Sequence, residues 1–236
     1  RDPIVAKLLN DGVATVKEAT TWQEIETLRY ELEHFVCEGQ YKAGLIRILE
    51  SFTSNANSTA QPAAWVSGFF GSGKSHFLKM LRHLWVNTRF DDGTTARELA
   101  QLPEEVHDLL KELDTLGKRC GGLHAAGGTL PSGEEKSLKL AVLGIIFRSK
   151  GLPESYPQAR LCLWLQKAGL YEQVKRIVEE SGKDFRDELR HLYVSPVISN
   201  ALLEADPDFA SDVKQVRAAI KAQFPNVNDI TTYEFI

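Results

Sequence analysis

The stretch "AAWVSGFFGSGKSHFLKML", residues 63–81, decides the fold that the sequence predicts. It matches the pattern G-x-x-x-x-G-K-[ST] at every fixed position. The matching residues are Gly68, Gly73, Lys74 and Ser75. At ordinary residue frequencies, a match of this kind occurs by chance in about one chain of this length in a hundred. The match therefore predicts a loop that binds phosphate.

The residues on either side of the motif support this prediction. The apolar run 63–66 favours a short buried strand, and the residues after the motif favour an amphipathic helix to about Trp85. In such a loop, backbone N–H groups from Gly71 to Ser75 point inward at an anion. The positive end of the following helix adds to the attraction. Lys74 is expected to reach the β- and γ-phosphates of ATP, and the Ser75 hydroxyl to ligate Mg²⁺.

The candidate site contains more residues than the fixed positions of the motif. Phe69 and Phe70 are expected to pack beneath the loop rather than to face a nucleotide base or a neighbouring subunit. His76 follows the motif and lies either near the phosphates or, as we favour, on a helix face. The candidate nucleotide-binding residues are Gly68, Gly71, Ser72, Gly73, Lys74, Ser75 and His76, with Lys74 also the candidate catalytic residue and Ser75 the candidate metal ligand.

Helical patterns dominate the rest of the chain. Thr21 and Glu24 have the spacing of a capping box at the start of a helix, for which Gly39 is a plausible C-terminal stop. A second amphipathic segment follows, and another helix is predicted to start at Pro103. Ser132 and Glu135 form a second possible capping box. The run that follows, to about Gly151, is read as a buried helix with a strand as the alternative.

These patterns together predict an α/β fold, with a P-loop NTPase core around a mainly parallel sheet and large helical additions. Small residues at 122–130 are read as a further strand. Three regions are expected. They are an N-terminal helical segment (1–62), a partial P-loop core (63–151) and a helical insertion or extension (152–236).

Composition limits the alternatives. The formal net charge of -4 does not favour a surface built to bind DNA, and no apolar run is long enough to span a membrane. The three scattered cysteines indicate reduced thiols in a cytoplasmic protein rather than a metal site. A modest basic cluster is read as a solvated helix face rather than a DNA contact. It consists of Lys79, Arg82, His83 and Arg89.

The sequence offers no clear acidic partner for the loop. Hydrolysis needs an acid after a second strand, to hold Mg²⁺ and to position the attacking water. The segments "RIVEE" (Glu179 and Glu180) and "ITTYEFI" (Glu234) do not fit, because the first is helical in pattern and the second ends the chain. Two explanations stay open. Either the acid lies beyond Ile236, which the missing initiator Met favours, or the protein binds nucleotide without cleaving it.

Several segments resemble the large P-loop ATPases of bacterial BREX phage-exclusion systems, the BrxC and PglY proteins. The resemblance is strongest in "WVSGFFGSGKSHFLKML" (65–81). It extends to the opening "RDPI", to "YELEHFVCEGQY" (30–41) and to "GLYEQVKRIVEESGKDFRDEL" (169–189). It implies an AAA+-like ATPase domain that uses ATP and Mg²⁺ in antiviral defence. The phosphate-loop roles carry over to Gly68, Gly71, Gly73, Lys74 and Ser75, whereas no position matches the acidic motif.

The resemblance also implies partners. These are other phage-defence proteins, DNA reached directly or through those proteins, and further copies of the chain in a homo-oligomer. Two other functions remain open on sequence grounds. One is a nucleotide-gated assembly scaffold with little turnover, and the other is an unrelated AAA+ origin-binding or signalling ATPase.

Overall fold

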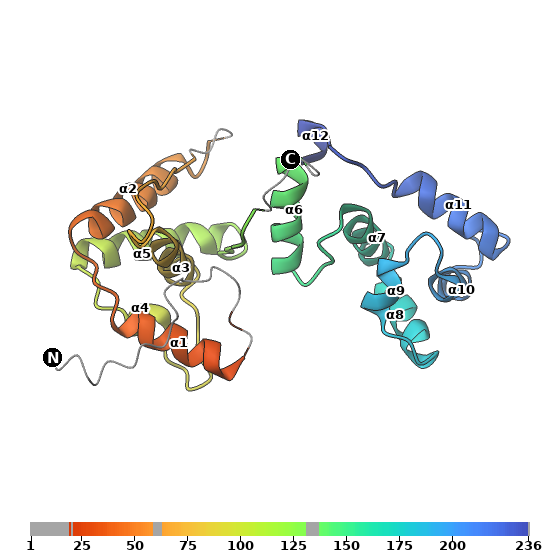
Figure 1. Cartoon of the computed structure of the whole chain (residues 1–236), viewed down its shortest axis with the longest axis horizontal. Coiled ribbons are helices and arrows are strands. Elements are labelled where there is room, and N and C mark those ends of the chain that lie inside the picture. The colour runs from red at the N-terminus through yellow and green to blue at the C-terminus, as the bar shows by residue number, and fades with distance from the viewer. Residues whose placement is uncertain (1–18, 20, 59–62, 131–136, 236) are drawn as a thin grey trace. The chain divides into compact units, whose positions relative to one another are not determined.

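The fold is helical. The computed structural model describes residues 19, 21–58, 63–130 and 137–235. Within these ranges the chain forms twelve helices and no β-strand, and extended backbone pairs at one isolated antiparallel bridge, between Arg89 and Thr95 (Figure 1). The predicted α/β core with a mainly parallel sheet is therefore wrong.

The sheet is absent because the segments expected to form it take other conformations. Residues 63–69 are irregular, and the small-residue run 123–130 is irregular too. The apolar run after Ser137 is a helix, whose first turn is capped by the Ser137 hydroxyl accepting from the Leu140 amide at 3.3 Å. A strand needs a neighbour that satisfies its backbone, and the described residues contain none for 63–66.

The first compact unit ends at Thr129, and its described residues form five helices. The capping box predicted at Thr21 is confirmed, since the Thr21 hydroxyl accepts from the Glu24 amide and Glu24 accepts from the Thr21 amide. Gly39 does not stop that helix but is the first residue of the next. The helices are α1 (Trp22–Glu33), α2 (Gly39–Asn55), α3 (Lys74–Trp85), α4 (Ala96–Leu99) and α5 (Glu104–Arg119).

A continuous apolar core joins these helices. α2 packs along α5, α3 contacts α4 and α5, and α1 contacts α4 (Figure 1). The core includes Leu32, Leu49, Met80, Leu84 and Leu113, each less than 2% exposed. Burial of this apolar surface holds α2 and α3 in place, and these two helices carry the candidate site.

Arg97 links three of these helices. Its side chain, 10% exposed, lies on α4. It donates to the carbonyls of Leu84 (2.7 Å) and Trp85 (3.0 Å) at the end of α3. It also binds both carboxylate oxygens of Asp114 on α5, at 2.6 and 3.0 Å. Because the last carbonyls of a helix have no partner within the helix, Arg97 satisfies the C-terminus of α3 and fastens it to α5.

The second unit begins at Leu130 and is also helical. Its core lies chiefly among α7, α8, α10 and α11, and side chains of Asp184, Ser195 and Asp212 cap three of its helices. The second predicted capping box, at Ser132 and Glu135, falls outside the described residues. The helices are α6 (Leu138–Ser149), α7 (Tyr156–Lys167), α8 (Tyr171–Glu180), α9 (Phe185–Arg190), α10 (Pro196–Ala205), α11 (Val213–Gln223) and α12 (Thr232–Phe235).

The division between the units follows α5, whereas the sequence predicted boundaries after residues 62 and 151.

No helix in the described ranges is both long and apolar enough to cross a lipid bilayer.

Candidate functional site

The loop of residues 68–73 leads directly into the N-terminus of α3. Gly71 and Gly73 both have positive φ, +78° and +79°, and the Ser72 amide donates to the Phe69 carbonyl at 3.2 Å. The first helical bond of α3 runs from the Phe77 amide to the Gly73 carbonyl at 2.8 Å. The tight turn of the loop thus ends where the helix begins, as the motif predicts.

The start of α3 presents unpaired backbone donors. Gly73 is the N-cap and has no side chain that could accept from the helix. Among the described residues, no acceptor is recorded for the amides of Gly73, Lys74, Ser75 and His76. A helix N-terminus with unpaired amides and its positive dipole end attracts anions. This end of α3 therefore has the donors that a phosphate group requires.

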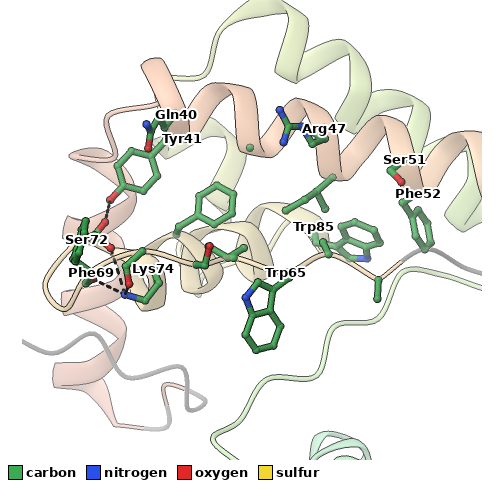
Figure 2. Close-up of a pocket in the computed structure, with 18 residues that line it drawn as sticks. Gln40, Tyr41, Arg47, Ser51, Phe52, Trp65, Phe69, Ser72, Lys74 and Trp85 are labelled. Atoms are coloured by element: carbon green, nitrogen blue, oxygen red, sulfur yellow. Dashed lines mark hydrogen bonds between the residues drawn. The ribbon is translucent and has the colours of Figure 1, made fainter.

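The Lys74 side chain folds back over the loop. Its Nζ donates to the carbonyls of Gly68 (2.9 Å) and Phe69 (2.6 Å), and it lies 3.4 Å from Ser72 Oγ. Figure 2 shows these bonds converging on the ammonium group. The positive charge therefore lies in the concave side of the loop, close to the start of α3. The loop that holds this cation ends at the uncapped first turn of α3.

Tyr41 braces the loop from α2, and nothing in the sequence pattern indicated this role. Its hydroxyl donates to the Ser72 carbonyl at 3.3 Å, and its ring packs between Phe35 and Phe77, at centroid distances of 6.0 and 5.8 Å (Figure 2). A Cβ added to Gly73 would lie 1.9 Å from the Tyr41 hydroxyl oxygen. Position 73 therefore requires glycine for two reasons: its φ is positive, and a side chain there would collide with the Tyr41 hydroxyl.

Replacing Gly73 with alanine should destabilise the chain more than replacing Gly71. Both substitutions put an L-residue at positive φ, which costs about 1 kcal/mol or more. Only at Gly73 does the new methyl group also collide with Tyr41, whereas a Cβ at Gly71 has nothing within 4 Å. Urea unfolding of both variants measures the difference. The prediction fails if Gly71→Ala is as destabilising, or if adding Tyr41→Phe to Gly73→Ala recovers no stability.

Ser75, the last residue of the motif, and His76, which follows it, lie in different surroundings. The Ser75 side chain is exposed. The ring of His76 packs against Phe35 at a centroid distance of 5.9 Å, and burial lowers the pKa of His76. The His76 ring is therefore engaged in packing against Phe35.

Phe69 and Phe70 do not pack beneath the loop, as the sequence led us to expect. They are 91% and 99% exposed, and Trp65 on the same segment is 92% exposed. Without neighbouring strands in the described residues, this segment has no surface to cover these side chains. The expectation assumed a core built on a sheet and fails with it.

The predicted basic cluster is not a solvated face either. Lys79 and His83 are 6% and 7% exposed. Lys79 forms an ion pair of 2.5 Å with Glu31 on α1, and His83 Nδ1 lies 2.9 Å from Thr88 Oγ1. These two positions face the core because α3 packs on two sides, which the amphipathic pattern alone did not indicate.

The buried His83 should make stability depend on pH. Burial, helped by the nearby charges of Arg82 and Lys79, lowers the pKa of His83 from 6.5 to about 4. Above pH 6.5 the imidazole is neutral in the folded and unfolded chain alike. Between pH 6.5 and 4 only the unfolded chain gains the proton, so about 3 kcal/mol of stability is lost as the pH falls.

Urea unfolding between pH 7 and pH 4 checks this dependence. His83→Gln should lose about 3 kcal/mol less than wild type over this range. His34→Gln, which removes an exposed histidine of the same unit, should keep the slope of the wild type. Equal slopes for all three chains would contradict the assignment.

A groove opens beside the loop. One wall is α2 and the other is the segment 63–69 with the loop and α3, and the groove encloses about 840 Å³ (Figure 2). Its described lining contains two cationic side chains, Arg47 and Lys74, and no Asp or Glu. Within the described residues there is also no group of three or more His, Cys, Asp or Glu side chains placed to hold a metal ion. The acid that hydrolysis needs is thus missing from this lining, as it was from the sequence pattern.

Comparison with known proteins assigns no family. No protein-family model matches the chain, and no solved structure matches it.

Proposed function

We propose that residues 68–75 bind the phosphate chain of ATP together with Mg²⁺. Lys74 contacts the β- and γ-phosphates, the amides of residues 73–76 donate to the phosphate oxygens, and the Ser75 hydroxyl ligates the metal. The observation that carries the proposal is the loop that folds around the Lys74 ammonium and leads directly into the uncapped N-terminus of α3.

The proposal does not depend on the sheet that the sequence predicted. An anion site of this kind needs a positive helix end, backbone donors and a counter-charge, and all three are local to the loop. The loop is held by Tyr41 from α2 and by the core beneath α3. Both supports come from helices, so neither requires a sheet.

Calorimetric titration in Mg²⁺ with adenosine, AMP, ADP, ATP and inorganic tripolyphosphate tests the proposal. Each further phosphate adds charge-assisted hydrogen bonds, so affinity should rise along the series, with ATP about tenfold or more tighter than AMP. Tripolyphosphate alone should also bind. Equal affinity for adenosine and ATP, or no binding of either polyphosphate, would overturn the proposal.

We further propose that the chain acts as a nucleotide-gated module of a cytoplasmic anti-phage defence protein, in which ATP binding orders an assembly with other defence proteins, DNA or further copies. The resemblance of residues 65–81 to BREX ATPases supports this context. The absence of an acid from the described lining of the groove favours binding over turnover.

The chain is accordingly expected to hydrolyse ATP slowly. Without a carboxylate to position water, the loop can hold the phosphates but gives little help to the attacking water. Phosphate release by the purified chain measures the rate, and Lys74→Ala supplies the background from contaminants. Brisk release that disappears in Lys74→Ala would show that a catalytic acid is present.

A further inference from the structure

The groove runs along the whole of α3. Its lining includes both Lys74, the first residue of α3, and Trp85, the last. At a rise of 1.5 Å per residue these positions lie about 16 Å apart along the helix axis. This length is comparable to that of an extended nucleoside triphosphate. The cavity volume of about 840 Å³ also falls in the range of small-molecule sites.

The chemistry of the lining changes along this length. At the loop end it holds the Ser72 hydroxyl and the Lys74 ammonium, beside the rings of Tyr41 and Phe69 (Figure 2). At the far end it is apolar and aromatic, with Phe52 and Trp85 in an edge-to-face contact at a centroid distance of 4.6 Å. Between the two ends, α2 contributes Arg47 and Ser51 to the wall.

This gradient matches one class of ligand. A nucleotide carries its negative charge at one end and an aromatic base at the other, with a hydroxylated sugar between them. Neither a purely apolar ligand nor a cation fits a groove with Lys74 and Arg47 and no acidic side chain in its described lining. Aromatic rings stack well on bases, and an arginine can also face a ring or a phosphate.

We infer that the groove between α2 and residues 63–74 holds the base and sugar of the same nucleotide whose phosphates occupy the loop. The base lies at the Phe52–Trp85 end and the sugar passes Arg47 and Ser51. This assignment rests on the proposed phosphate site and extends it with a base-binding site. It also makes the exposed segment 63–66 a wall of the ligand site.

A variant that fills the groove tests the assignment. Ala64 is exposed and lines the groove, so Ala64→Trp adds bulk there without disturbing the core. Ala43 on α2 is equally exposed but lies outside the lining, which makes Ala43→Trp the matched control. We expect Ala64→Trp to weaken ATP binding about tenfold, as loss of base stacking does. Its affinity for tripolyphosphate should stay within about twofold of wild type, because the loop remains open.

Tryptophan fluorescence gives a second readout. ATP should change the emission of the wild-type chain, tripolyphosphate should not, and Trp85→Phe should reduce the ATP-induced change. The base site is overturned, and the phosphate site retained, if ATP binds wild type no more tightly than tripolyphosphate or if Ala64→Trp binds ATP normally. If neither ligand binds the wild-type chain, the phosphate site and the base site are both overturned. Adenosine binding as tightly as ATP would keep the groove and overturn the phosphate loop.

Discussion

Replacing Lys74 with alanine is expected to weaken binding of Mg·ATP by about 10- to 100-fold while the chain stays folded. Among the residues that the structure describes, the ammonium is the one charged group inside the loop, and a hydrogen bond to a charged group contributes about 1.5–3 kcal/mol. Removing it leaves the amides of α3 in place, so weak binding should persist. Calorimetry in Mg²⁺ measures the loss.

Two further variants separate charge from structure in this experiment. Lys118→Ala removes an exposed lysine of the same unit and should leave ATP affinity unchanged. Lys74→Arg keeps the charge but not its compact shape, so its affinity should fall between those of wild type and Lys74→Ala. If Lys74→Ala binds ATP as wild type does, Lys74 is an ordinary lysine in a turn.

The largest loss of stability is expected from Arg97→Met. The substitution keeps an apolar chain of similar length but removes the charged donor from the carbonyls of Leu84 and Trp85, and it leaves Asp114 without its bidentate partner. The Asp114 side chain is 40% exposed and is hydrated once Arg97 is gone, so the loss comes chiefly from the carbonyls, at about 1.5–3 kcal/mol for a hydrogen bond to a charged group. Urea unfolding followed by tryptophan fluorescence should report the loss, since Trp85 ends the helix that Arg97 holds.

Arg89→Met is the matched control for Arg97→Met. Arg89 lies in the same unit and is exposed, so its loss should change stability by less than about 0.5 kcal/mol. Asp114→Asn should cost less than Arg97→Met, because the three backbone carbonyls keep their donor. Equal effects of Arg97→Met and Arg89→Met would mean that Arg97 does not hold α3 to α5.

The helices could be predicted wherever their signals are local. The capping box of Thr21 and Glu24 depends on two residues of one turn, and it forms as expected. The start of α3 at Lys74 and that of α5 just after Pro103 follow in the same way from residues next to each other in the chain. The run after Ser137, for which a helix was favoured and a strand was the alternative, is a helix, and its cap is Ser137.

The errors concern features that depend on partners far along the chain. A strand at 63–66 requires a second strand, and no local pattern tells whether one exists. The burial of Phe69 and Phe70 was inferred from that absent sheet. Tyr41 was seen only as an apolar position of α2, since its contact with Ser72 joins residues 31 apart. The motif located the loop itself, but the groove beside it depends on how α2 lies against α3.

The position of the Lys74 ammonium bears on which ligands the loop would select. The ammonium donates to two carbonyl oxygens of the loop, those of Gly68 and Phe69. An anion that binds the ammonium must replace these oxygens as its hydrogen-bond acceptors. Binding would therefore exchange one set of acceptors for another. A single phosphate is expected to gain little binding free energy from this exchange. A chain of phosphates makes several contacts at once and is expected to displace the ammonium from its backbone partners. We therefore expect the loop to prefer ligands that carry several negative charges.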